Sequence, residues 1–387
     1  MHRSTPYLSV DLSVVRARFA ELRAALPGAR VFYSVKANPA PRVLATLAGA
    51  GAGFDVASVG ELRLALAAGA TPATLCHANP VRTATDVLEA ARAGVGLFVT
   101  DSAEDLAVLS RHAPGAEVLV RLAVDEDGAA TPFGGKFGCS RAEAAGLLRR
   151  AGTCGLRPVG LSFHVGSQQL RPGAWRAAVE AASAVVADAG WSRLPLLDVG
   201  GGFPVRYRED VPSLDRIAGE IRAAVRTGFP DDPPELAVEP GRFLVAEAGV
   251  LHASVVRVSR RHDGRRWVYL DVGRYGGLAE TEGEAIGYRL ATAHDGRGSG
   301  QHGGTAPAVL AGPTCDGDDV LYREVELPVA LRAGDRIRIM AAGAYTASYS
   351  AVGFNGLPPL PVICHDSDGS PGPPGRLPDQ LPDEVPV

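Results

Sequence analysis

Reactive side chains in this chain stand directly after short apolar runs that are typical of β-strands. The first run, residues 31–36, is Val-Phe-Tyr-Ser-Val-Lys, and Asn38-Pro39 then interrupts the strand pattern. A lysine is costly to desolvate, and its ammonium is easily shifted toward the neutral amine that forms a Schiff base. A strand-end lysine is more often solvated or ion-paired, however. The chemical interpretation of Lys36 therefore depends on the other segments.

A strand that runs into three glycines indicates a site for an anion. Residues 196–199 lead into Gly200-Gly201-Gly202, whose backbone N–H groups can approach a phosphate closely because no side chains intervene. The segment lacks the GxGxxG spacing of dinucleotide sites and the GK[ST] of P-loops, so a single phosphate fits better than a nucleotide. A plain tight turn is the alternative.

A carboxylate and a cation follow another run. Glu239 ends residues 236–239, and Arg242 stands three positions later. A carboxylate that faces a pyridine nitrogen keeps that nitrogen protonated, which makes the ring an electron sink. Arg242 would then contact a phosphate or orient its loop. A local ion pair between Glu239 and Arg242 is the alternative, and this motif alone favours neither.

Two further segments contribute an imidazole and a thiol. His164 ends residues 159–164 and Ser167 follows; the pair suits stacking on a flat cofactor and donation to its phosphate, whereas a structural histidine is the alternative. A hydrolase is disfavoured because no G-x-S-x-G elbow occurs where one would be needed. Cys315 lies among acids on the Pro/Gly-rich turn 312–319. A buried or incidental thiol is the default interpretation, but a cysteine on such a polar turn is a better candidate for acid–base catalysis than a thiol in the core. Residues 343–349, with Tyr345, resemble an edge strand or a segment that closes over a ligand.

Eight such apolar runs alternate with helix-like stretches, which predicts parallel strands with right-handed crossovers. Eight units over about 250 residues predict a closed (β/α)8 barrel, with its active site at the carboxyl ends of the strands. A doubly wound open sheet is the alternative. The runs are residues 31–36, 53–57, 74–79, 97–100, 118–122, 159–164, 196–200 and 236–239, and they end on or near Lys36, Asp55, Asn79, Arg121, His164, Gly200 and Glu239.

The predicted fold class is α/β with a second domain. Residues 1–22 form an N-terminal segment expected to pair with the second domain, residues 23–246 form the barrel, residues 247–365 form an antiparallel β domain, and residues 366–387 are expected to be disordered. Residues 291–304 are expected to be a loose loop. Its histidines, His294 and His302, lack partners at ligand spacing, so no metal site is predicted.

Composition restricts the class of protein. A chain of 387 residues with 46% hydrophobic residues can fill two cores, and its net charge of −4 offers no footprint for nucleic acid. We expect no membrane span and no signal peptide. Five scattered cysteines fit free thiols in a reducing cytoplasm.

Taken in chain order, these segments resemble the fold-type III pyridoxal-phosphate-dependent decarboxylases, the ornithine/lysine/diaminopimelate decarboxylase family. The resemblance covers about residues 7–362, and so many motifs in family order make it specific. The matching segments are Tyr33-Ser34-Val35-Lys36-Ala37-Asn38, Phe54-Asp55-Val56-Ala57-Ser58, Lys136-Phe137-Gly138, His164-Val165-Gly166-Ser167, Gly200-Gly201-Gly202-Phe203-Pro204, Glu239-Pro240-Gly241-Arg242, Cys315-Asp316-Gly317, Gly343-Ala344-Tyr345-Thr346 and Phe354-Asn355-Gly356.

The resemblance implies pyridoxal 5'-phosphate as cofactor and a cytoplasmic homodimer with shared active sites. It implies that Lys36 holds the cofactor as a Schiff base, that Glu239 pairs with the ring nitrogen and that His164 stacks on the ring. Asp55, Glu61 and Arg121 would support the lysine and the ring. Cys315 would reprotonate Cα in the neighbouring subunit's site, and Asp316 and Phe354 would bind substrate. The implied phosphate ligands are Gly200, Gly201, Gly202, Ser167, Arg242 and Tyr345.

The implied reaction is decarboxylation of a basic L-amino acid, ornithine or lysine first, to a diamine of polyamine biosynthesis. Residues 268–278 resemble the bacterial ornithine/lysine branch, and Val272 stands where eukaryotic-type ornithine decarboxylases carry a second substrate-binding acid. Asp316, with a second acid from Asp318 or Asp319, would bind a distal amine. Meso-diaminopimelate, a specialised-metabolite precursor, a racemase and a non-catalytic regulatory homologue are the alternatives.

Overall fold

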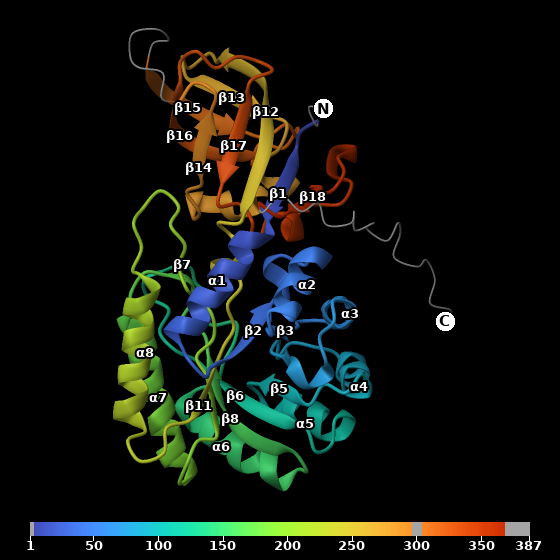
Figure 1. Ribbon diagram of the computed structural model, residues 1–387, viewed down its shortest axis with the longest axis vertical. Coiled ribbons are helices and arrows are strands. Elements are labelled where there is room, and N and C mark those ends of the chain that lie inside the picture. The colour runs from blue at the N-terminus through green and yellow to red at the C-terminus, as the bar shows by residue number, and fades with distance from the viewer. Residues whose placement is uncertain (1–3, 296–303, 368–387) are drawn as a thin grey trace, which may run out of the picture.

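Within the described residues, 4–295 and 304–367, this computed structural model has a closed barrel and a β domain (Figure 1). Eight parallel strands form the barrel in the order β10–β11–β2–β3–β4–β5–β6–β8. Each overlaps one predicted apolar run, so the (β/α)8 prediction is confirmed and the open sheet is excluded. The strands are β2 (Arg30–Ser34), β3 (Gly53–Asp55), β4 (Leu75–His77), β5 (Leu97–Thr100), β6 (Glu117–Leu122), β8 (Arg157–Phe163), β10 (Leu196–Asp198) and β11 (Glu235–Val238).

Helices surround the barrel, and most of them begin at a side chain that caps their free backbone N–H groups. Ser58, Ser102 and Ser213 each accept a hydrogen bond from the third residue of the helix that follows, whereas Thr83 and Ser140 form full capping boxes. Each helix buries one apolar face against the strands. The helices are α1 (Leu12–Ala25), α2 (Pro41–Gly49), α3 (Val59–Ala67), α4 (Ala84–Arg92), α5 (Ala103–His112), α6 (Arg141–Thr153), α7 (Gly173–Ala189), α8 (Leu214–Gly228) and α9 (Arg242–Val245).

The β domain is one mixed sheet above the barrel (Figure 1). Its main path runs β14–β17–β12–β13–β15–β16, and β1 pairs with both β12 and β18. The strands are β1 (Tyr7–Asp11), β12 (Gly249–Arg260), β13 (Arg266–Leu270), β14 (Arg289–Thr292), β15 (Thr305–Ala311), β16 (Val320–Pro328), β17 (Arg336–Met340) and β18 (Val362–His365).

The strand β1 belongs to the β domain, and the chain then crosses to the barrel. Leu8 lies opposite Leu251 in an antiparallel pair with β12 and opposite Val362 in a parallel pair with β18. The helix α1 follows immediately and packs against α2, α8 and α9. In Figure 1 the blue β1 accordingly lies beside the yellow β12, although the two strands are far apart in sequence.

Three features of the β domain differ from the sequence-based expectation. The sheet is not wholly antiparallel, because β13 pairs with β15 in parallel; the long connection between them allows the chain to reverse twice. The strands β14 and β15 were not predicted. Residues 343–349 form no strand, since Tyr345 has a φ of 53° that breaks an extended path.

A small two-stranded sheet, β7 (Ala129–Thr131) with β9 (Ser167–Gln169), joins the loop after β6 to the loop after β8. The predicted loose loop 291–304 begins as strand β14, and His294 forms an ion pair with Asp335 at 3.0 Å. Residues 296–303, with His302, lie outside the described part, as does the predicted tail beyond Ser367. Among the described residues, every helix is too short or too polar to cross a bilayer. No cluster suited to a metal ion occurs in that same part of the chain.

Candidate active site

A cavity of about 560 Å³ opens at the carboxyl ends of the barrel strands. Barrel loops supply most of its wall, and the β domain supplies the remainder. Seven residues singled out in the sequence line it together: Lys36, His164, Ser167, Gly202, Glu239, Arg242 and Tyr345. The fold thus gathers side chains that are as many as 309 positions apart in sequence.

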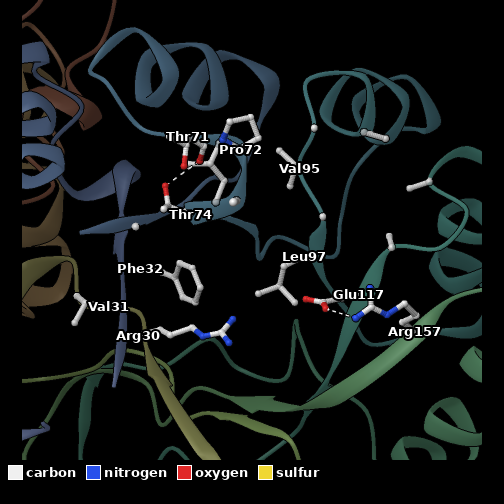
Figure 2. A pocket seen from close by; sticks show the side chains of 18 of the residues that line it. Arg30, Val31, Phe32, Thr71, Pro72, Thr74, Val95, Leu97, Glu117 and Arg157 are labelled. Carbon is white, nitrogen blue, oxygen red and sulfur yellow. Dashed lines mark hydrogen bonds and ion pairs between the residues drawn. The ribbon is translucent and has the colours of Figure 1, made fainter. Parts of the chain in front are cut away.

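A larger cavity, about 1170 Å³, lies at the opposite mouth of the barrel (Figure 2). The starts of the strands line it, including Arg30, Phe32 and Leu97. Three of its charged side chains are in ion pairs: Arg157 with Glu117 at 2.7 Å, and Arg30 with Glu235 at 2.6 Å. Residues at this end of such barrels serve stability, so the chemistry belongs to the smaller cavity.

Lys36 lies in a short 3₁₀ turn, Val35–Ala37, directly after β2. Its Nζ is 3.2 Å from Oδ2 of Asp55, an oxygen that also accepts a hydrogen bond from Ser34. Desolvation opposes the ammonium, but the charges of Asp55, Tyr345 and Glu239 outweigh it and raise the pKa of Lys36. This direction is opposite to the one expected from sequence, because the fold places carboxylates around the lysine. Its side chain remains 48% exposed, which leaves it open to the cavity.

Glu239 follows β11 and shares its surroundings with Asp198 at the end of β10. Desolvation together with the charge of Asp198 raises the pKa of Glu239 well above its ordinary value. Desolvation together with the charge of Asp55 raises the pKa of Asp198 to about 6. Asp198 accepts a hydrogen bond from the N–H of Gly200 at 2.9 Å. Oε1 of Glu239 and Oδ2 of Asp198 have no donor among the described residues. The pair is therefore arranged to hold one proton between them.

His164 is held neutral at the end of β8. Its Nδ1 accepts a hydrogen bond from the backbone N–H of Gly166 at 3.0 Å, which places the ring proton on Nε2. Desolvation and the charges of Arg121 and Lys36 lower its pKa well below the ordinary value. Phe133 packs edge-on to the imidazole at 4.8 Å, and Arg121 lies over the Phe133 ring at 5.4 Å. The histidine thus offers an uncharged, fixed ring face to the cavity.

Arg242 lines the cavity and is 4% exposed. Glu280 accepts hydrogen bonds from both terminal nitrogens, at 2.8 and 2.5 Å, and Nη1 also donates to the hydroxyl of Tyr207 at 2.8 Å. Nη2 lies 3.3 Å from Oγ of Ser167, and the guanidinium stacks over the Tyr345 ring at 4.9 Å. Nε has no partner among the described residues. The Glu239–Arg242 ion pair considered from sequence does not form, because Glu280 takes that place.

Glu280 and Tyr207 were missed in the sequence. Glu280 lies in a turn, Ala279–Glu284, that joins no recognisable motif. Tyr207 follows the three glycines by five positions but belongs to no apolar run. Each of them binds Arg242, and Glu280 also lines the cavity; these contacts arise from tertiary packing.

The three glycines pass through a space that no side chain could share. A Cβ on Gly200 would lie 2.2 Å from the carbonyl oxygen of Phe163, and one on Gly202 would lie 2.4 Å from that of Gly166. A Cβ on Gly201 would lie 3.1 Å from Nε2 of His164. Gly200 and Gly202 also have positive φ values, 69° and 89°. The segment is therefore a backbone cradle beside the imidazole.

Glu61 and Asn79 both contact the backbone of Ala57, which follows β3. The carboxylate of Glu61 accepts a hydrogen bond from the N–H of Ala57 at 2.7 Å, which ties the start of α3 to the end of β3. Burial raises the pKa of Glu61. Asn79 donates to the carbonyl of Val81 at 2.9 Å and orders the loop after β4. Both residues support the mouth of the barrel and do not line the cavity.

The turn 312–319, with Cys315 and Asp316, lies apart from the cavity. Among the described residues, none from this turn lines the cavity, and Cys315 is exposed. Desolvation, the charge of Asp316 and a hydrogen bond to its carboxylate raise the pKa of Tyr275. Phe354 packs on the ring of Tyr275 at 4.6 Å. These residues form an exposed face of the β domain that we call the thiol face: Tyr275, Cys315, Asp316, Phe354 and Asn355.

Asp319 has a structural place in that turn and is 2% exposed. Its carboxylate accepts hydrogen bonds from the N–H of Arg274 at 2.8 Å and from the N–H and hydroxyl of Thr314 at 3.0 and 2.7 Å. Cβ atoms on Gly273 or Gly312 would lie 2.0 or 2.3 Å from its oxygens. The carboxylate of Asp319 is therefore engaged inside the protein, so of the two acids considered from sequence Asp318 is the one left for a substrate.

The cavity fits a phosphorylated pyridine cofactor. The unpartnered Nε of Arg242 beside Ser167 suits a phosphate, and the glycine cradle leaves room for it. The unpartnered Oε1 of Glu239 suits a ring N–H, and Lys36 supplies the amine for attachment. Each element of the group thus meets a side chain of complementary chemistry.

Comparisons with known proteins agree with this site. Residues 12–246 match the family of pyridoxal-dependent decarboxylases, pyridoxal binding domain. The lysine/ornithine decarboxylase of Selenomonas ruminantium is 36% identical over 363 residues, covering 93% of this chain and 89% of that protein. A lysine/ornithine decarboxylase from Vibrio vulnificus, complexed with putrescine, is 34% identical with a TM-score of 0.82, covering 93% of this chain and 94% of that one. SrLDC, solved with PLP and cadaverine, is 35% identical with a TM-score of 0.84, covering 94% and 91%. The chain therefore belongs to the pyridoxal-dependent decarboxylases, and its cofactor is pyridoxal 5'-phosphate.

Proposed function

We propose that this enzyme decarboxylates a basic L-amino acid, ornithine or lysine first, to the corresponding diamine and CO2. The observation that carries the proposal is a single cavity lined by Lys36, Glu239 and Arg242. Behind it, the buried Asp198 forms an acid pair with Glu239. The relatives named as lysine/ornithine decarboxylases support the same substrate class. A diamine product belongs to polyamine biosynthesis.

The position of each side chain in the site suggests its role in the reaction. Lys36 would hold the cofactor, whose ring accepts the bond electrons when the substrate carboxylate leaves. Glu239, supported by Asp198, would keep a proton at the ring nitrogen, and the neutral face of His164 would lie against the ring. Arg242, Ser167, Tyr345 and the cradle Gly200 to Gly202 would bind the phosphate. Asp55 and Arg121 would set the charge around the lysine and the ring.

We propose further that two copies of the chain share each site. Cys315 and Asp316 lie on the exposed thiol face, outside the cavity of their own chain. A second copy that placed this face over the cavity mouth would add a thiol to reprotonate Cα and a carboxylate to bind the substrate. Such a pair would be a symmetric homodimer with two shared sites. The five free cysteines support a reducing, cytoplasmic compartment.

Charge selects the substrate within this proposal. The carboxylate of Asp316 is fixed by the N–H of Asp318 at 2.8 Å and faces Tyr275, with Phe354 beside it. A distal ammonium would gain a charge-assisted hydrogen bond there, whereas a distal carboxylate would be repelled. Asp318 remains as the second acid, since Asp319 is committed elsewhere. Meso-diaminopimelate is therefore the weaker candidate.

One experiment tests the activity and the attachment site together. Purified enzyme is incubated with L-ornithine, L-lysine, L-arginine and meso-diaminopimelate, and the amines formed are identified by mass spectrometry. Borohydride should fix the cofactor to the peptide that contains Lys36. The chain has one other lysine, Lys136, so Lys136→Ala is a matched control that should label and turn over normally. Labelling at Lys136, or turnover of diaminopimelate alone, would contradict the proposal; no amine from any substrate would favour a non-catalytic homologue.

A further inference from the structure

Asn355 contacts Cys315 through both polar atoms of its side chain. The backbone N–H of Cys315 donates to Oδ1 at 3.2 Å, and Nδ2 lies 3.2 Å from the sulfur. The same Oδ1 is 3.5 Å from the sulfur. The two residues are 40 positions apart in sequence, so this contact depends on the fold of the β domain.

The backbone N–H fixes the orientation of the amide. An N–H can only donate, so it must face the carbonyl oxygen of Asn355, and the amide nitrogen must then face the sulfur. The sulfur thus accepts a hydrogen bond from Nδ2. Between these two residues, the S–H proton of Cys315 has only Oδ1 of Asn355 as an acceptor, at the longer distance of 3.5 Å. This proton is therefore available to an acceptor outside the thiol face.

The backbone around Asn355 holds the amide in this position. Asn355 has a φ of 51°, a left-handed conformation that asparagine tolerates better than most residues, and it lies between Gly353 and Gly356. Its neighbour Phe354 packs on Tyr275, and the N–H of Ala351 donates to the carbonyl of Tyr275 at 2.8 Å. The segment is therefore anchored to the residue that also contacts Asp316.

We propose that Asn355 is the positioning residue for Cys315 as the acid of the reaction. This inference rests on the role given to Cys315 in the proposed function. Loss of CO2 leaves an electron pair on Cα; the S–H bond breaks, its proton forms the new C–H bond, and the sulfur keeps the bonding electrons as a thiolate. The side-chain Nδ2–H of Asn355 donates a hydrogen bond to that thiolate, and a proton from water restores the thiol. Asn355 thereby directs the proton outward and stabilises the sulfur after transfer.

Three variants separate this role from a structural one. Asn355→Gly removes the amide, and glycine adopts the positive φ without strain. Asn355→Asp keeps an oxygen for the N–H of Cys315 but offers the sulfur no N–H. Cys315→Ala gives the rate without the thiol, and the Cys315→Ala/Asn355→Gly double variant completes the cycle.

Three readouts are expected to change together. Asn355→Gly and Asn355→Asp should each lower kcat about tenfold while KM stays within about twofold, because the substrate is bound by other groups. The ratio of amine to CO2 should fall below one; a proton that reaches the cofactor carbon instead of Cα leads, with water, to an aldehyde product whose nitrogen stays on the cofactor. Iodoacetamide should alkylate Cys315 about two- to fivefold more slowly at pH 7 in the protein without substrate, since the thiolate has lost a donor.

The outcomes decide between the inference and the function on which it rests. Wild-type kcat, product ratio and alkylation in Asn355→Gly would overturn the inference, as would a wild-type Asn355→Asp, which would leave only the backbone contact important. In the Cys315→Ala background, Asn355→Gly should have no further effect. If Cys315→Ala itself turns over normally, the acid named under the proposed function is wrong, whereas the alkylation rates still decide whether Asn355 holds the thiol.

Discussion

Replacing Asp198 by asparagine should stabilise the protein once the cofactor has been removed. Asp198 is fully buried, one of its oxygens has no donor among the described residues, and its neighbour is another acid, Glu239. An asparagine keeps the oxygen that accepts from Gly200 and places an N–H₂ group toward Glu239. The change therefore removes an unfavourable buried charge and leaves the packing intact.

The size of the effect follows from the pKa. Burial raises the pKa of Asp198 from 3.8 in the unfolded protein to about 6 in the folded protein. One pKa unit corresponds to 1.36 kcal/mol, so at a pH where Asp198 is ionised in both the folded and the unfolded protein, its burial lowers the free energy of unfolding by about 3 kcal/mol. Because the folded-state pKa is the higher one, the folded protein binds the proton more tightly between these values. Stability is therefore lost as the pH rises through this window. The gain from Asp198→Asn should be about 1 kcal/mol at pH 4.5 and about 3 kcal/mol at pH 8.

Urea unfolding of the cofactor-free protein, at pH 4.5 and at pH 8, measures this difference. The exposed Asp231→Asn serves as a matched control and should change neither value. A gain from Asp198→Asn that is equal at both pH values would show that the charge is not its source. If Asp198→Asn lowered the free energy of unfolding at pH 8, the idea that the buried Asp198 carboxylate destabilises the fold would be refuted.

Three further predictions concern the reaction. Glu239→Gln should slow decarboxylation about 100-fold, as expected from an electrostatic contribution of ~3 kcal/mol; a near-normal kcat would make Glu239 merely structural. Mixing inactive Lys36→Ala with inactive Cys315→Ala should restore about a quarter of wild-type activity through one intact hybrid site, and no recovery after proven subunit exchange would contradict a shared site. Asp316→Ala should lower kcat/KM for ornithine or lysine about 10- to 100-fold, and an equal loss with a substrate that lacks the distal amine would argue against charge recognition.

The barrel could be predicted from sequence because its signals are local. Each strand is a short apolar run followed by a helix with its own capping residue, such as Ser58 or Ser140, and both signals lie within a few positions. The order of the runs then fixes which side chains meet at the carboxyl end. For this reason Lys36, His164 and Glu239 could be placed in one site before their distances were known.

The remaining features depend on contacts between distant segments. Glu280 and Tyr207 both bind Arg242 in the site, and no local pattern indicates those contacts. The pKa of Lys36 moves opposite to the expectation because Asp55 and Glu239 converge on it. Strand β15 was missed because Pro307 lies within it and a proline weakens the strand pattern.

The anchoring of Asp319 has a consequence for how this enzyme's substrate range can change. The base of the turn is fixed from within by that carboxylate and by two glycines, Gly273 and Gly312, that make room for it. The tip, which carries Asp316 and Asp318, contributes little to the core. Substitutions at the tip can therefore accumulate while the fold stays stable, whereas substitutions at the base would destabilise the protein. Substrate preference in such a scaffold can diverge quickly while the barrel chemistry stays the same.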